Sequence, residues 1–171
     1  RERYWGTPIP VWICPECEKE HCIGSIAEME EMKTTDSQMP PELHRPYVDD
    51  VKLNCPSSGC SGEMVREPYV MDCWFDSGCA SFAQWHYPFE NTDKFDGSFP
   101  VDYICEAVDQ TRGWFYSLLA VSTTVFDSIS YRRCLSLGHI LDKEGKKMSK
   151  SRGNVVNPWD HFNKEGSDSI R

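Results

Sequence analysis

The chain of 171 residues carries 18 lysines and arginines against 27 aspartates and glutamates, a formal net charge of -9 at pH 7. This balance argues against strong autonomous binding of nucleic acid, because modules with that function present a broad basic face to phosphates. Hydrophobic residues make up 39% of the chain and aromatic residues 12%, which excludes disorder throughout and allows one substantial domain or a domain with a small module.

Cysteine content and hydropathy indicate the compartment. The nine cysteines are an odd number, and no run of apolar residues approaches the roughly 18 needed for a membrane span. The first ten residues also lack the apolar stretch of a secretory signal. We therefore predict a cytoplasmic protein without a membrane partner, in which thiols serve a metal or packing rather than disulfides.

Two cysteine knuckles organise the first third of the chain. Cys14 and Cys17 belong to CPEC, and Cys55 and Cys60 belong to CPSSGC. Four thiolates on tight turns suit a tetrahedral Zn²⁺ ion, and a module too small for a large core gains stability from such a metal. The pattern predicts a zinc-ribbon-like module with one structural Zn²⁺. Reduced structural cysteines are the alternative.

The exact ligand set stays open at the level of sequence. Cys22, His21 or His44 could replace one of the four knuckle cysteines. Between the knuckles, the Ser25–Glu28 string has the form of a capping box and predicts a short helix through Met32. The prolines at 40 and 41 predict a loop over 39–41.

The pattern after Pro68 is that of an α/β fold. Residues 99–105 are predicted to form a strand, 111–126 a largely apolar helix and 134–140 a second strand. This order implies a parallel crossover, and ligands of such sheets bind beyond the carboxyl ends of the strands. Further on, Asn157 and Pro158 predict the start of a helix that Gly166 ends.

The loop after the second predicted strand holds a concentrated positive charge in an acidic chain. Five basic residues fall between positions 143 and 152, and residues 147–151 read KMSKS. Glycines at 145 and 153 provide backbone freedom, while Lys147 and Lys150 offer ammonium groups to a polyphosphate as charge develops on it. A solvated basic turn is the alternative interpretation.

Several strings together resemble one enzyme family. KMSKS is similar to the second signature of class I aminoacyl-tRNA synthetases. DCWFDSG at 72–78, EAVDQTRGWF at 106–115 and RERYWGTPIPVW at 1–12 resemble the catalytic core of the isoleucyl-tRNA synthetases, over essentially the whole chain. Ala107 stands where that family usually has glycine. Thr111 in DQTRGW points to the archaeal and eukaryotic-like branch.

The resemblance implies an architecture. Residues 1–10 would return from the inserted editing domain, 11–68 would form the inserted zinc-ribbon-like module, 69–157 the second half of a Rossmann-like nucleotide-binding fold with the KMSKS loop, and 158–171 the start of a helical region. The first signature, HIGH, would lie upstream of Arg1, so the fragment alone is expected to be inactive.

The resemblance also implies a reaction and the residues that serve it. The whole enzyme would activate L-isoleucine with ATP and Mg²⁺ and transfer it to tRNA(Ile). Trp74 and Trp114 would form walls of the isoleucine pocket beside Gln110, while Glu106 and Asp109 would contact the adenylate. Lys147 and Lys150 would be catalytic, acting in the transition state. The implied ATP-binding residues are Gly138, His139, Lys147, Met148, Ser149, Lys150 and Ser151.

Two other functions compete with this interpretation. A valine or leucine ligase of the same class would share KMSKS and the cysteine knuckles but should lack the DQTRGWF string. A non-catalytic zinc-ribbon module that binds RNA or protein would use the knuckles as its scaffold. The acidic balance and the complete KMSKS string argue against this second alternative.

Overall fold

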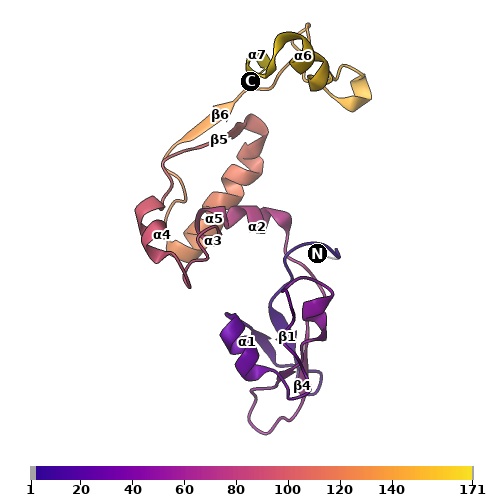
Figure 1. Ribbon diagram of the computed structural model, residues 1–171, viewed down its shortest axis with the longest axis vertical. Helices are drawn as coiled ribbons and strands as arrows, with labels where there is room; N and C mark the ends of the chain where they lie inside the picture. The colour runs from indigo at the N-terminus through magenta and orange to yellow at the C-terminus, as the bar shows by residue number, and fades with distance from the viewer. Residues whose placement is uncertain (1–2, 171) are drawn as a thin grey trace.

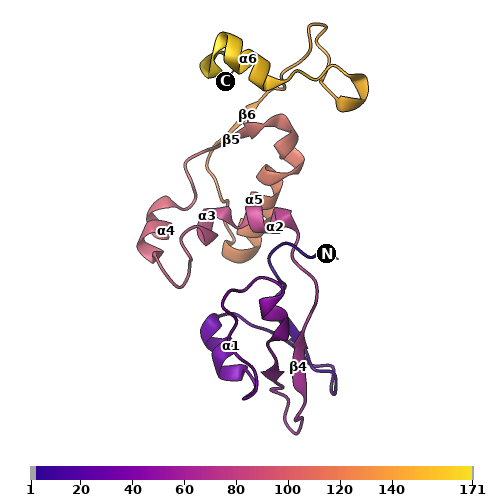
Figure 2. The same ribbon diagram turned by 45° about the vertical axis from the view of Figure 1, so that its right-hand side comes forward.

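The computed structural model describes residues 3–170, which form an elongated molecule of three parts (Figure 1). A small antiparallel sheet lies at one end, helices with a two-stranded parallel sheet lie in the middle, and two short helices lie at the other end. The view turned by 45° keeps this order (Figure 2). Among residues 3–170, no helix has the length and apolar character needed to cross a bilayer.

The antiparallel sheet packs around a buried tryptophan. Its strand order is β2-β1-β4-β3. Trp12, Leu53 and Met64 are fully buried, and Trp12 Nε1 donates a 2.8 Å hydrogen bond to the Val51 carbonyl. The elements of this part are β1 (Val11–Ile13), β2 (Glu20–Cys22), α1 (Ile26–Met32), the 3₁₀ helix η1 (Tyr47–Asp50), β3 (Leu53–Asn54) and β4 (Glu63–Arg66).

Helix α1 begins as the capping box predicts and ends at Met32. The Glu28 backbone N–H donates to Ser25 Oγ at 3.1 Å. The return bond differs from the standard box, because the Glu28 carboxylate accepts from the Gly24 N–H at 2.7 Å rather than from the cap residue. The predicted loop over 39–41 is also confirmed.

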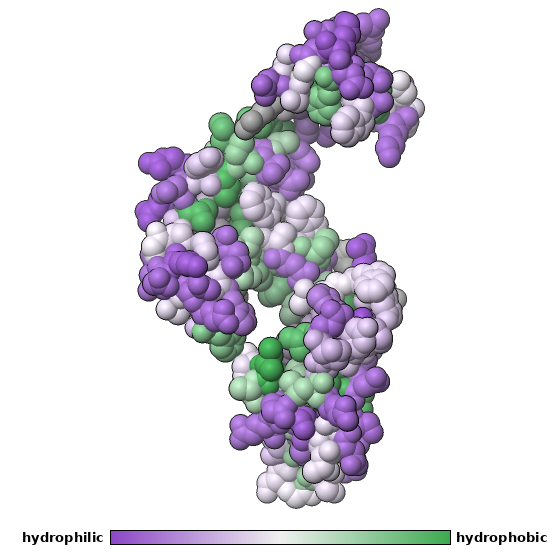
Figure 3. Space-filling view, viewed as in Figure 1, coloured by the Kyte–Doolittle hydropathy of each residue, from purple (hydrophilic) through white to green (hydrophobic). Residues whose placement is uncertain are grey.

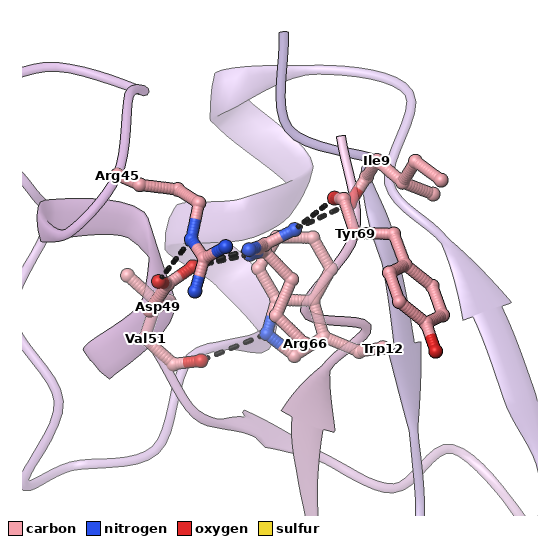
Figure 4. Close-up of polar contacts among 7 residues, drawn as sticks. All are labelled: Ile9, Trp12, Arg45, Asp49, Val51, Arg66 and Tyr69. Atoms are coloured by element: carbon pink, nitrogen blue, oxygen red, sulfur yellow. Dashed lines mark hydrogen bonds and ion pairs between the residues drawn. The ribbon is translucent and has the colours of Figure 1, made fainter. Parts of the chain in front are cut away.

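A buried arginine ties this sheet to the segments that enter and leave it (Figure 4). The Arg66 side chain is 1% exposed and forms an ion pair with Asp49, whose other carboxylate oxygen accepts from Arg45 Nε at 2.7 Å. Arg66 Nη1 also donates to the carbonyls of Ile9 at 3.3 Å and Tyr69 at 3.1 Å. One guanidinium thus connects β4, η1 and both connecting segments.

We expect Asp49→Asn to destabilise this part by about 3 kcal/mol, because it leaves the buried Arg66 charge without its carboxylate. Hydrogen exchange of the β1 and β4 amides in the full-length protein measures the opening free energy. Asp50→Asn, a neighbouring exposed carboxylate, is the matched control and should change little. Equal exchange in both variants would contradict the prediction.

The same pair makes a prediction about pH. Burial alone would raise the pKa of Asp49, but hydrogen bonds and charge from Arg45 and Arg66 outweigh burial and hold that pKa below its ordinary value of 3.8. A carboxyl with a lowered folded pKa contributes stability above its unfolded pKa and loses it as pH falls through the folded pKa. The opening free energy should therefore fall on acidification below about pH 4, less steeply in Asp49→Asn.

The middle part contains the predicted parallel crossover. Strands β5 (Ile104–Ala107) and β6 (Cys134–Leu137) pair in parallel, and α5 (Trp114–Phe126) connects them. The remaining elements of this part are α2 (Cys73–Gly78), α3 (Ala80–Ala83), α4 (Thr92–Ser98) and the 3₁₀ helix η2 (Val108–Arg112). Helix α2 packs closely on α5 at Gly78, where an added Cβ would lie 2.8 Å from the Ser117 carbonyl oxygen.

The bounds of these elements differ from the predicted ranges 99–105, 111–126 and 134–140. Ahead of Ile104 only Val101 forms a bridge, to Tyr131, and Pro100 has no N–H to extend the pairing further. Strand β6 ends at Leu137, opposite the last residue of β5. Helix α5 starts three residues late because Gly113, at φ -128° and ψ -112°, separates it from η2.

The last part follows the KMSKS loop and contains the 3₁₀ helix η3 (Lys150–Arg152), α6 (Pro158–Glu165) and α7 (Ser167–Ile170). Asn157 caps α6 through a 3.2 Å hydrogen bond from the Trp159 N–H, Pro158 is its first residue, and Gly166 follows its last. The predicted start and end of this helix are therefore confirmed.

Apolar side chains remain exposed where β5 and β6 run (Figure 3). Leu135 is 54% exposed and Leu137 49% exposed, and every residue of β6 is accessible. Parallel sheets are normally covered on both faces, so the exposed surface of this two-stranded sheet is suited to contact with further strands or helices. The described residues therefore leave this sheet without the cover that a parallel sheet usually has.

Candidate functional site

The four knuckle cysteines converge on one point. Sγ of Cys14 lies 3.7 Å from that of Cys60, and Sγ of Cys17 lies 3.5 Å from that of Cys55. All four sulfurs lie within 4.8 Å of one another. A tetrahedron of thiolates at about 2.3 Å from a Zn²⁺ ion has edges of about 3.8 Å. The cluster therefore has the size of a tetrahedral metal site.

Local backbone structure builds each knuckle. The Cys14 carbonyl accepts from the Glu18 N–H at 2.9 Å, and Glu18 takes the left-handed φ of 58° that closes the turn. In the second knuckle the Cys60 N–H donates to the Ser57 carbonyl at 3.1 Å. A Cβ at Gly62 would lie 2.7 Å from Cys14 Sγ, so the site requires glycine there.

The thiols differ in acidity. Hydrogen bonds from the Lys19 backbone N–H and the Ser57 hydroxyl lower the pKa of Cys17 to about 6. The Gly62 N–H would lower the pKa of Cys60, but desolvation and the neighbouring thiols raise it to about 12. Cys17 thus supplies a thiolate near neutral pH, while a metal ion must displace the proton of Cys60.

The alternative ligands lie outside this cluster. His21 Nε2 is engaged with the Glu28 carboxylate at 2.9 Å, and His44 Nδ1 lies 3.9 Å from the Glu42 carboxylate. Cys22 is exposed on β2. Among residues 3–170, the four knuckle cysteines form the one group able to hold a metal ion, so none of the three substitutes is needed.

A cavity of about 660 Å³ opens at the carboxyl ends of β5 and β6. It collects residues that the sequence places far apart. Glu106 lies within β5 rather than after it, and its side chain reaches the cavity beside residues from the end of β6 and the loop beyond. The lining residues are Glu106, Ala107, Leu137, Gly138, His139, Ile140, Lys147, Met148 and Ile170.

The KMSKS loop combines a hairpin with a short 3₁₀ turn. Leu141 bridges Lys147, and the Asp142 carboxylate accepts from the N–H groups of Glu144 and Lys146 at 3.0 and 2.8 Å. Ser149 then caps η3, accepting from the Arg152 N–H at 3.3 Å and lying 3.0 Å from Ser151 Oγ.

Both lysines of the KMSKS loop have free ammonium groups. Lys147 and Lys150 are exposed, and within residues 3–170 neither makes an ion pair. Lys147 lines the cavity, whereas Lys150 stands on η3 outside its lining. The Lys147 charge is therefore available to an anion in the cavity, whereas the Lys150 charge faces solvent outside its lining.

The residues predicted for the isoleucine pocket form a separate group around the start of α5. Gln110 Oε1 accepts from the Trp114 N–H at 2.9 Å, and Trp114 Nε1 donates to the Ser77 carbonyl at 3.0 Å. An added Cβ at Gly113 would lie 3.0 Å from the Trp74 ring. Trp114 thus joins α5 to α2, and Gln110 satisfies the first N–H of α5, two contacts that their predicted roles did not anticipate.

Trp74 lines a different hollow from the one at the strand ends. Its ring is 45% exposed and borders a hollow of about 340 Å³ that also touches Asp72, Arg112 and Tyr116. Trp114 is half-buried and does not line it, and Asp109 is exposed on η2. The described residues therefore place Trp74 and the strand-end group in two separate hollows that share no lining residue.

Sequence reasoning missed two polar residues in the KMSKS loop. Asn154 Nδ2 donates to the Asp142 carboxylate at 2.6 Å, and Asn154 Oδ1 accepts from the Ser149 N–H at 2.9 Å. The sequence DKEG from Asp142 to Gly145 is a turn pattern that could have indicated the hairpin. The long-range bond to Asn154 had no such local signal.

Sequence comparison places the chain in a family. Residues 1–171 match the family described as tRNA synthetases class I (I, L, M and V). The match covers the chain from end to end, and the parallel crossover with the KMSKS loop after its second strand accompanies it. The chain belongs to this family of class I tRNA synthetases.

Individual relatives show which ligases of this family the chain is similar to. The chain is 58% identical over its full 171 residues to the isoleucine–tRNA ligase of Clostridium novyi and 56% identical to that of Clostridium tetani. An isoleucine–tRNA ligase 2 of Bacillus cereus is 52% identical. The chain spans 16% of the length of each of these relatives.

These relatives are bacterial, so the branch suggested by Thr111 receives no support from them. Among solved structures, a chain in the ternary complex of Agrobacterium radiobacter K84 agnB2 LeuRS with tRNA and LeuAMS has a TM-score of 0.67 and 23% sequence identity. The match covers 99% of this chain and 22% of that one. At this identity the likeness concerns the fold alone.

Proposed function

We propose that the chain is part of an isoleucine–tRNA ligase, which activates L-isoleucine with ATP and transfers it to tRNA(Ile). The observation that carries the proposal is the identity of 52–58% over the whole chain to proteins of that name. The DQTRGWF string favours isoleucine over a valine or leucine ligase, and the strand-end cavity with Lys147 in its lining argues against a purely structural zinc-ribbon module.

The proposal divides the chain as the sequence resemblance does. Residues 1–10 return from an editing insertion, 11–68 form the metal-binding module, 69–157 the second half of a Rossmann-like fold, and 158–171 begin a helical region. Exposed Leu135 and Leu137 support an incomplete sheet that further strands of the full-length protein would cover. On this basis the fragment alone does not catalyse adenylate formation.

In the proposed activation step, a carboxylate oxygen of isoleucine forms a bond to the α-phosphorus of ATP. The bond from that phosphorus to the bridging oxygen breaks, and pyrophosphate leaves with the electron pair. Such a transfer depends on positioning and on stabilising negative charge, which suits the two free loop lysines, Lys147 and Lys150. Mg²⁺ would accompany the ATP phosphates; we assign it no protein ligand.

Within the same proposal the strand-end cavity receives the adenylate. Gly138 and His139 line it next to the adenine position, and the Glu106 carboxylate faces the substrate ammonium or ribose hydroxyls. Asp109 on η2 is a second carboxylate for those groups. The KMSKS loop also contributes Met148, Ser149 and Ser151 to ATP binding. Trp74 presents an exposed side chain to the isoleucine side chain, Trp114 joins α5 to the helix that carries Trp74, and Gln110 caps α5 beside them.

We also propose that the cysteine cluster holds one structural Zn²⁺. The fit rests on the 3.5–3.7 Å sulfur separations and on the all-thiolate donor set, which suits zinc. The ion would fasten the two knuckles of a sheet whose strands are only two to four residues long. A closed Cys₄ set leaves no open position, so its role is structural.

The proposed function is tested by ATP–pyrophosphate exchange with the full-length protein. Isoleucine should support exchange more strongly than valine, which lacks one methylene, a pair that is the standard example of limited discrimination by an apolar pocket. Leucine should support little. Stronger exchange with valine or leucine would move the assignment to another ligase, and no exchange with any amino acid would overturn it.

A further inference from the structure

We propose that Asn154 is a positioning residue that braces the KMSKS loop and sets where Lys147 and Lys150 stand. The inference rests on the proposed function and deepens it. Asn154 lies just beyond the η3 turn and is half-buried, while the lysines that it would position are exposed. Its side-chain amide is the one group among residues 3–170 that joins the hairpin, Lys147 and the η3 turn.

The brace consists of three contacts from a single amide. Asn154 Nδ2 donates to Asp142 Oδ2 at 2.6 Å and lies 3.4 Å from the Lys147 carbonyl oxygen. Asn154 Oδ1 accepts from the Ser149 N–H at 2.9 Å. The backbones on either side of Met148 are thereby fixed with respect to each other, and both lysines are attached to them.

Asp142 is committed to this arrangement. Its Oδ1 accepts from the backbone N–H groups of Glu144 and Lys146, which leaves Oδ2 to Asn154. The bond from Asn154 is the leading reason that the pKa of Asp142 lies below its ordinary value. The carboxylate is therefore ionised at neutral pH, and the bond to Asn154 is a charge-assisted one.

The conformational freedom of the KMSKS loop explains why such a brace matters. Gly145 and Gly153 occupy left-handed backbone conformations at φ 75° and 67°, and the described residues give the lysine ammonium groups no ion pair to hold them. A group that stabilises a transition state must be placed closely, since a misplacement of about 1 Å can cost about a hundredfold in rate. The other printed hydrogen bonds of the loop stay within the hairpin or within η3, so among residues 3–170 the Asn154 amide is what joins the two.

Two substitutions test the brace by changing its charge and the direction of its hydrogen bond, without removing either side chain. Asn154→Asp keeps an acceptor for the Ser149 N–H but puts a second carboxylate against that of Asp142. Adding Asp142→Asn restores a donor–acceptor pair with its direction reversed, because the amide at position 142 then donates to the carboxylate at 154. Asn157→Asp is the control, since it adds the same charge at a helix cap outside the brace and likewise sets a second carboxylate beside an existing one, that of Asp160, whose Oδ1 lies 3.4 Å from Asn157 Nδ2.

Single-turnover formation of isoleucyl-adenylate at saturating ATP is the first readout in the full-length protein. Asn154→Asp should slow it by about ten- to a hundredfold, and the double variant should recover most of the rate. Asn157→Asp should match the unmodified protein. A normal rate in Asn154→Asp, or a double variant no faster than the single one, would overturn the inference.

Trypsin cleavage after Lys147, Lys150 and Arg152 is a second readout that needs no activity. Cleavage in the full-length protein should be faster in Asn154→Asp and return toward the unmodified rate in the double variant. If the unmodified protein forms no isoleucyl-adenylate, the proposed function fails while the cleavage rates still decide on the brace. Equal cleavage in all variants would show that the amide does not restrain the loop.

Discussion

Replacing Cys14 and Cys55 together by serine in the full-length protein should remove the bound metal and unfold the part of the chain from 11 to 68. Each substitution takes one thiolate from one of the two close sulfur pairs. Structural zinc sites contribute about 10–16 kcal/mol to the folded state of small domains. Strands of two to four residues around one buried tryptophan cannot replace that contribution.

Two measurements report the loss of the metal and the unfolding of the sheet. Elemental analysis gives the zinc content per protein, and hydrogen exchange of the Trp12 and Met64 amides reports the folding of the sheet. Cys22→Ser is the matched control, because Cys22 is exposed on β2 and lies outside the cluster. Full protection of these amides in a metal-free sample would show that the cysteines are structural without a metal, and unchanged zinc in the double variant would show that Cys14 and Cys55 are not its ligands.

The cysteine cluster was open to prediction because its geometry is local. Each knuckle is a tight turn that brings two thiols together, so only the meeting of two turns had to be inferred. The competing ligand His21 could not be dismissed in the same way. Its partner Glu28 was understood as part of a capping box, and only the fold shows that this carboxylate also engages the imidazole at 2.9 Å.

The α/β part also has features that the sequence predicted and features that it did not. Apolar runs predicted two parallel strands and the helix between them, but the ends of the strands depend on where each partner begins and stops. Gln110 illustrates the limit for side chains. The family string implied a role beside isoleucine, which stays a prediction, but it did not indicate that the amide oxygen of Gln110 caps α5. The Trp114 N–H lies at the start of α5, where no helical carbonyl can accept from it, and the Gln110 oxygen accepts instead. No pattern of residue types in the sequence indicates such a contact.

Lys150→Ala should lower the single-turnover rate of isoleucyl-adenylate formation by about a hundred- to a thousandfold at saturating ATP, in the full-length protein. The Lys150 ammonium group is exposed, has no ion pair within residues 3–170, and stands on η3 outside the strand-end cavity. We therefore expect it to reach the phosphates only when the loop moves. Loss of one preorganised donor that acts on developing charge has about this effect.

The ATP KM distinguishes this role from a simple anchor. If Lys150 bound ground-state ATP and the transition state equally, its loss would raise the ATP KM and leave the rate nearly unchanged. Lys164→Ala is the control for removal of a positive charge, because Lys164 lies on α6 and pairs with Glu165 at 2.8 Å. A near-normal rate with a raised KM in Lys150→Ala would assign the KMSKS loop to ATP binding, whereas a reduced rate with an unchanged KM places its charge in the transition state.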